Sequence, residues 1–259
     1  MVHHGKMTTN PETIDIDSMP RGGPDASWLD RRLQTDRLEY LDRDDVSDRV
    51  KKQVIGSLDL MGRILGLHGK FAELTLSEVA DIADPKILEL GSGHGGLSRK
   101  LLEQHPTAEV TVSDINPELV AAMATGDLGS HPRATVRVID ATDIDAPDRH
   151  YDLAVFAQSF HHLPPPLAAQ VIAEGTRAAD KLLIIDLPRP RSPLHLIKLA
   201  SVLPLVPVLP FAHDGFISFL RAYSPSAFQA LAAHADPGIA VTFPKLRGSQ
   251  AVVLARRPG

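Results

Sequence analysis

The chain has 259 residues, of which 43% are hydrophobic and 23% charged, and its formal net charge is -5 at pH 7. This length supports one well-buried α/β domain with appendages, and the charge lacks the basic character that binds nucleic acid backbones, so we expect no nucleic acid partner. The 0 cysteines exclude disulfides, thiolate nucleophiles and cysteine-based zinc sites, and they fit a cytoplasmic location.

The first residues are polar, and they are rich in proline, glycine, aspartate and threonine without periodicity. We therefore expect residues 1–46 to form a flexible or only partly ordered N-terminal tail, followed by a domain over 47–259. The start of the chain lacks the apolar core of a signal peptide. No apolar run has the length of a transmembrane helix, so we expect no stable membrane insertion.

A helix is predicted to begin after Ser47, a good N-cap residue, and to end at Gly69. Apolar residues recur at helical spacing between these two positions. They are Val50, Val54, Leu58, Met61 and Leu65.

The next hundred residues alternate between strand-like and helix-like blocks, which is typical of a doubly wound parallel sheet. The last part of the chain predicts an antiparallel hairpin. The expected fold is α/β, Rossmann-like, with a seven-stranded sheet that is mostly parallel and ends in this hairpin. The strands are expected near 86–90, 109–113, 134–139, 152–157, 181–186, 239–243 and 251–255.

An apolar insertion occupies roughly residues 190–222, between the fifth strand and the hairpin. Pro204, Pro207 and Pro210 make one continuous helix improbable there. One interpretation is an apolar lid over a substrate pocket, and the other is ordinary core or the contact of a homodimer.

A glycine-rich turn follows the strand at 86–90, with the sequence Gly-Ser-Gly-His-Gly-Gly from Gly91. Glycine lets the backbone approach a ligand closely. Glu89 lies two residues before the turn, where a carboxylate repels a pyrophosphate but favours a cationic or hydroxyl-rich ligand. Because Gly96 also completes a dinucleotide-type pattern, the glycines alone do not identify the ligand.

Further acidic residues close the second and third strands, at Asp114 and Asp140. With Glu89 and the glycines they resemble the class I S-adenosylmethionine-dependent methyltransferases, in particular the small-molecule group that includes the ubiquinone/menaquinone methyltransferases. The resemblance covers about residues 50–257 and implies S-adenosylmethionine as the cofactor. It implies binding by Glu89, Gly91, Gly93, Gly95, Asp114, Ile115, Asp140, Ala141, Ala157 and Gln158.

Three histidines are candidate catalytic bases, because histidine accepts protons near neutral pH. His161 and His162 follow the fourth strand, although such a pair could simply cap the next turn. His213 is followed by Asp214 and, two helical turns later, by Arg221, which could stabilise an oxyanion or form a structural salt bridge. The histidines show no metal-ligand spacing, so we expect a metal-independent protein.

These features predict an enzyme of secondary metabolism that transfers a methyl group to a small, fairly apolar acceptor. The preferred target is a phenolic or enolic oxygen, with carbon less favoured. The alternatives are an NAD(P)-dependent oxidoreductase and a non-catalytic nucleoside-binding protein. A possible homodimer is left open.

Overall fold

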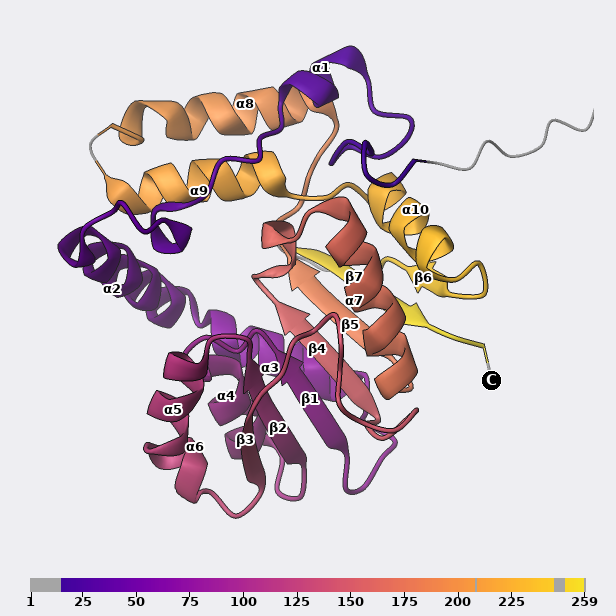
Figure 1. Cartoon of the computed structure of the whole chain (residues 1–259). Coiled ribbons are helices and arrows are strands. Elements are labelled where there is room, and N and C mark those ends of the chain that lie inside the picture. The colour runs from indigo at the N-terminus through magenta and orange to yellow at the C-terminus, as the bar shows by residue number, and fades with distance from the viewer. Residues whose placement is uncertain (1–14, 208, 245–249, 259) are drawn as a thin grey trace, which may run out of the picture.

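The computed structural model describes residues 15–207, 209–244 and 250–258. A seven-stranded sheet in the order β3-β2-β1-β4-β5-β7-β6 runs through the molecule (Figure 1). The strands are β1 (Lys86–Leu90), β2 (Glu109–Asp114), β3 (Ala134–Val138), β4 (Leu153–Ala157), β5 (Leu182–Asp186), β6 (Ala240–Thr242) and β7 (Ala251–Arg256).

Strands β1 to β5 are parallel, and β7 pairs antiparallel with both β5 and β6. The predicted seven-stranded α/β fold with its antiparallel C-terminal hairpin is therefore confirmed. β5 is buried along its whole length and β4 along all but its last residue, as expected for strands covered on both faces. The carboxyl ends of the parallel strands meet at one edge, where ligands of such sheets bind.

Alternate strand residues enter two cores on opposite faces of the sheet. Ile87 belongs to the core that α3, α4 and α5 cover, whereas Leu88 belongs to the core formed with α7 and α10. The helices of these two layers are α3 (Leu67–Ser77), α4 (Gly96–Gln104), α5 (Pro117–Ala124), α6 (Asp127–Ser130), α7 (Pro165–Ala178) and α10 (Pro225–Ala235).

The described part of the N-terminal segment, 15–46, packs on the domain, so this part of the expected flexible or partly ordered tail is ordered. Ile16 and Met19 join the main core, and α1 (Trp28–Arg32) and η1 (Tyr40–Asp42) follow them. The apolar side chains in this polar stretch are too few to form a periodic pattern, but the domain buries two of them, Ile16 and Met19. Residues 1–14 of the expected tail lie outside the described residues.

The helix predicted from Ser47 to Gly69 is two helices. α2 (Asp48–Leu65) ends before Gly66, which has φ of +61°, and α3 begins at Leu67. Gly66 is the residue that can adopt this left-handed conformation at low cost. Gly69 lies inside α3.

The apolar insertion folds as a helical hairpin above the carboxyl edge of the sheet (Figure 1). It comprises α8 (Ser192–Val202), η3 (Leu203–Leu205) and α9 (Pro210–Arg221). The helical structure is interrupted at the prolines, as predicted, because proline fits the first turn of a helix but disrupts its interior. Among the described helices, none combines the length and apolar character needed to cross a membrane.

Candidate active site

The glycine turn after β1 uses the conformational freedom of three glycines. Gly91, Gly93 and Gly95 have φ values of +60°, +56° and +72°, a region that other residues rarely adopt. A Cβ on Gly91 would come within 2.9 Å of the Phe156 ring, whereas a Cβ on Gly93 would meet no atom within 4 Å. The turn is therefore packed against the sheet at Gly91 and open at Gly93. This arrangement lets a ligand approach the backbone of the turn closely.

Glu89 lies beneath this turn, with 3% of its surface exposed. Burial raises the pKa of its carboxyl group to about 7, although the hydrogen bond from Ser98 on α4 lowers it. In the cofactor-free protein the side chain therefore lies at the boundary between its neutral and charged forms. Contact between Glu89 and the cofactor stays a prediction.

Asp114 connects the end of β2 to the glycine turn. Its Oδ2 accepts a hydrogen bond from the backbone N–H of Gly93 at 2.9 Å, and its Oδ1 accepts one from Asn116 at 2.9 Å. These bonds fix the orientation of the carboxylate, which still has acceptor capacity for ligand hydroxyls. Next to it, the apolar side chain of Ile115 is 65% exposed.

The remaining predicted cofactor residues lie at the same edge. Asp140 and Ala141 follow β3, and Asp140 Oδ1 accepts hydrogen bonds from both the N–H and the hydroxyl of Thr142. Ala157 ends β4, and Gln158 has φ of +60°. All ten predicted residues thus belong to the carboxyl ends of β1 to β4 or to the turns that follow, and the backbone of the turn, open at Gly93, suits the close approach of a nucleoside cofactor.

His161 lies between two carboxylates and has only 4% of its surface exposed. Its Nδ1 is 2.7 Å from Oδ1 of Asp186, at the end of β5, and its Nε2 is 3.4 Å from Oε1 of Glu39. Although burial lowers the pKa of His161, the carboxylates of Asp186 and Glu39 raise it to about 9. A group that holds its proton at neutral pH is a poor general base.

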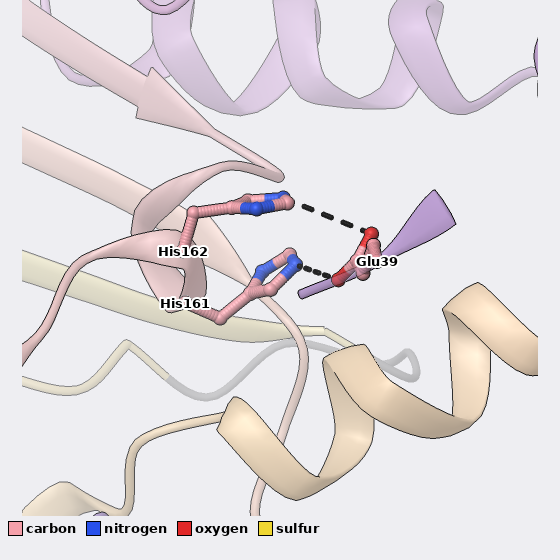
Figure 2. A group of neighbouring side chains, drawn as sticks. All are labelled: Glu39, His161 and His162. Carbon is pink, nitrogen blue, oxygen red and sulfur yellow. Dashed lines mark ion pairs between the residues drawn. The ribbon is translucent and has the colours of Figure 1, made fainter. Parts of the chain in front are cut away.

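His162 is more open, with 30% of its side chain exposed. Its Nδ1 is 2.9 Å from Oδ2 of Asp42, and its Nε2 is 3.9 Å from Oε2 of Glu39 (Figure 2). The rings of His161 and His162 lie 4.4 Å apart with a tilt of 34°. The pair therefore presents two imidazoles to one carboxylate.

His213, on α9, is oriented by a buried carboxylate. Its Nδ1 is 2.9 Å from Oδ1 of Asp214, which is 2% exposed and also accepts a hydrogen bond from the backbone N–H of Tyr40 at 2.8 Å. The imidazole stacks on the Tyr40 ring at 3.8 Å with a tilt of 4°. These contacts fix the ring and direct Nδ1 toward Asp214, an arrangement that suits Nε2 as a proton acceptor.

An open pocket of about 470 Å³ adjoins His213. It is lined by Arg37, Leu38, Arg43, Asp45 and His213. A second pocket, of about 330 Å³, includes Lys86 and Glu109 at the amino ends of β1 and β2. That edge is opposite the glycine turn, so the second pocket is not the site.

Sequence reasoning missed the acidic partners of the histidines. Glu39 and Asp42 lie in the segment predicted as a tail, and Asp186 lies in a strand that gave no sign of a function. Of the two roles expected for Arg221, the structure favours the structural one: it is 5% exposed, lies 3.8 Å from Asp42 and donates hydrogen bonds to the backbone carbonyls of Arg37 and His162. Its guanidinium therefore holds the structure together and is not free to stabilise an oxyanion.

Comparisons with known proteins agree with this geometry. The family model described as a methyltransferase domain matches residues 87–181, which include all ten predicted cofactor residues. Over 167 residues the chain is 26% identical to the ubiquinone/menaquinone biosynthesis C-methyltransferase UbiE of Cupriavidus necator, and the alignment covers 61% of this chain and 68% of that relative.

Solved methyltransferases share the fold. The plantazolicin methyltransferase BpumL in complex with SAH aligns with a TM-score of 0.61 at 12% identity, over 85% of this chain and 93% of that one. An O-methyltransferase family 2 protein from Planctomyces limnophilus, in complex with apigenin, aligns with a TM-score of 0.54 at 19% identity. That alignment covers 83% of this chain and 63% of the other, so this chain matches less than two thirds of that neighbour's length.

Proposed function

We propose that the chain, which is a class I S-adenosylmethionine-dependent methyltransferase, methylates a small, fairly apolar acceptor at a phenolic or enolic oxygen. S-adenosylmethionine supplies an activated methyl group. The protein must therefore hold the acceptor in line with that group and remove the proton of the acceptor hydroxyl. The glycine turn and the strand ends of β1 to β4 would hold the cofactor.

The observation that carries this proposal is the pairing of His213 with Asp214 beside the 470 Å³ pocket. A base oriented by a buried carboxylate is a common arrangement for proton removal from a hydroxyl. The charge of Asp214 would stabilise the imidazolium that forms. Arg37, which lines the same pocket, would favour the anionic form of the acceptor.

The two other candidate histidines fit this role less well. His161 holds its proton between Asp186 and Glu39 and is therefore not free to accept one from the acceptor. His162 faces the carboxylates of Asp42 and Glu39. Of the three predicted catalytic histidines, we therefore propose His213 as the base.

The helical hairpin of α8 and α9 supports an apolar acceptor. Leu194, Ile197 and Leu203 are 60%, 66% and 54% exposed, and solvated aliphatic side chains of this size favour covering an apolar molecule. We propose that residues 190–222 act as the acceptor lid.

Methylation at carbon is the second candidate, because the curated relatives are named as C-methyltransferases. An enol or phenol that has lost its proton also carries negative charge on carbon, so the same base would serve both reactions. The alternatives of an NAD(P)-dependent oxidoreductase and a non-catalytic nucleoside-binding protein receive no support from these relatives.

The test is a screen of phenols, quinols and enols with S-adenosylmethionine labelled with ¹³C at the methyl group. We expect S-adenosylhomocysteine to form with an apolar phenol or enol, and the ¹³C chemical shift of the product identifies an O-methyl or a C-methyl group. With the best acceptor, His213→Ala should lower kcat by about a hundredfold and leave cofactor affinity unchanged. Full turnover by that variant would overturn the assignment of the base, and transfer only to nitrogen acceptors would overturn the acceptor class.

A further inference from the structure

Glu39, His161 and His162 form a cluster that the proposed proton transfer does not use. Each can offer one ligand atom, and these atoms all lie within 4.8 Å of one another. Figure 2 shows both imidazoles turned toward the Glu39 carboxylate. Two imidazoles and one carboxylate are a common ligand set for divalent transition-metal ions.

A further carboxylate orients each imidazole. Asp186 lies 2.7 Å from Nδ1 of His161, and Asp42 lies 2.9 Å from Nδ1 of His162. In metal sites, a ligating histidine typically donates its other N–H to such a carboxylate, which fixes the tautomer and raises the basicity of the ligand. Both Nε2 atoms are then directed at Glu39 as ligands.

The interatomic distances favour a shared ion over a direct hydrogen bond. Within the described residues, Nε2 of His161 is buried and has no hydrogen-bond partner. Its distance of 3.4 Å to Glu39 exceeds the roughly 2.7–2.9 Å of a charged N–H···O bond. Two ligand atoms that are each about 2.1 Å from one ion lie roughly 3.0–4.2 Å apart, and the 3.4 Å and 3.9 Å separations from Glu39 fall in this range.

The surrounding charge also favours a cation. Glu39, Asp42 and Asp186 bring three carboxylates to two imidazoles, and Glu39 and Asp186 are 5% and 2% exposed. Arg221 approaches Asp42 at 3.8 Å and offsets only part of this charge. In the metal-free protein the proton that His161 holds compensates part of this charge, and a bound dication would replace that proton on binding.

We propose that Glu39, His161 and His162 bind a divalent first-row transition-metal ion of the Zn²⁺ class, with Asp186 and Asp42 as positioning residues. The ion would cross-link the N-terminal segment, through Glu39, to the turn after β4. Binding should therefore stabilise the fold as well as fill the site. The half-exposed side of His162 is the entry path.

The experiment is a calorimetric titration of the chelator-treated full chain with Zn²⁺, repeated with Co²⁺ to record its visible absorption. His3→Ala and His4→Ala are introduced throughout, so that this histidine pair at the start of the chain cannot bind the probe. We expect one equivalent of Zn²⁺ at micromolar affinity or tighter, a raised Tm and a Co²⁺ spectrum with nitrogen ligands. Glu39→Gln and His162→Ala should each weaken binding at least tenfold, and Asp42→Asn should weaken it by about 10–100-fold.

His234→Ala is the matched control, because His234 is exposed on α10 away from the cluster, and its removal should leave Zn²⁺ affinity unchanged. His162 is half-exposed, so the His162→Ala variant keeps the test valid if Glu39→Gln folds poorly. No Zn²⁺ binding by the parent protein, or equal binding by the parent and His162→Ala, would overturn the proposal. Because the readouts are binding and Tm, they are independent of whether an acceptor is found.

Discussion

Arg21 donates a hydrogen bond through Nη1 to the backbone carbonyl of His161, 2.9 Å away. The same nitrogen donates to the carbonyl of Arg221 at 3.0 Å, and the guanidinium lies over the Tyr223 ring at 4.5 Å. One residue of the N-terminal segment thus joins the turn after β4 to the end of α9. The segment is therefore part of the structure that shapes the site.

We predict that Arg21→Ala destabilises the protein. The substitution leaves the carbonyls of His161 and Arg221 without this donor in a buried environment, and the free energy of unfolding should fall by about 2–4 kcal/mol. Urea denaturation followed by circular dichroism measures the change. Arg31→Ala is the control, because Arg31 is exposed and donates to carbonyls of its own segment, and it should change the free energy by less than about 0.5 kcal/mol. Equal effects of the two substitutions would show that the segment contributes little to stability.

A second prediction distinguishes the roles of Gly91 and Gly93 in the turn. Gly93→Ala should cost about 1 kcal/mol of stability, because φ is +56° but the added Cβ meets open space. Its affinity for S-adenosylhomocysteine should fall at least tenfold, because that space is where we place the cofactor. Gly91→Ala should cost about 1–3 kcal/mol more in stability, since its Cβ would press on Phe156 at 2.9 Å. Calorimetric titration and denaturation measure both quantities, and full affinity in Gly93→Ala would mean that Gly93 does not face the cofactor.

The sequence predicts the sheet well because each strand carries its own signal. The runs around Ile87, Val110 and Leu183 are apolar and bounded by turn residues, so local pattern and tertiary burial agree. The predicted cofactor residues also share one edge, because parallel strands bring their carboxyl ends together.

The acidic partners of the histidines could not be predicted in the same way. Glu39 contacts His161 across a long separation in sequence, and this contact depends on how residues 15–46 pack. Their few apolar residues, such as Ile16 and Met19, have no periodicity that would indicate burial. The end of α2 at Gly66 was equally hard to predict. Gly56, Gly62 and Gly69 lie in the same region, and each could have adopted the left-handed conformation that ends a helix.

A third prediction distinguishes a lid from a dimer contact on α8. Ile197→Ser replaces a side chain that is 66% exposed, so the fold should be unaffected. If α8 covers the acceptor, the KM for the acceptor should rise several-fold and cofactor affinity should stay constant. Leu167→Ser, at a 40% exposed position on α7, is the control and should leave KM unchanged. An unchanged KM in Ile197→Ser, combined with a fall in molar mass by light scattering, would assign this face to self-association.

The fourth prediction concerns the pH dependence of stability in the cofactor-free protein. Burial raises the pKa of Glu89 from 4.5 to about 7, so between these values the folded state holds a proton that the unfolded state has released. The contribution of Glu89 to stability is therefore fully present below about pH 4.5 and is lost as the pH rises to about 7, a change of roughly 3 kcal/mol. Glu89→Gln carries no titrating group, and its free energy of unfolding should exceed that of the parent increasingly over this interval.

Denaturation of both proteins at several pH values measures this difference directly. Subtracting the two curves removes the contributions of all other groups, provided that they titrate alike in both proteins. Glu103→Gln is the control, since Glu103 lies on the exposed side of α4 and pairs with Lys100, and it should follow the parent curve. Parallel curves for the parent and Glu89→Gln would mean that Glu89 stays charged in the folded protein. Some other group would then stabilise the Glu89 charge before the cofactor binds, because the hydrogen bond from Ser98 alone does not offset the cost of burying that charge.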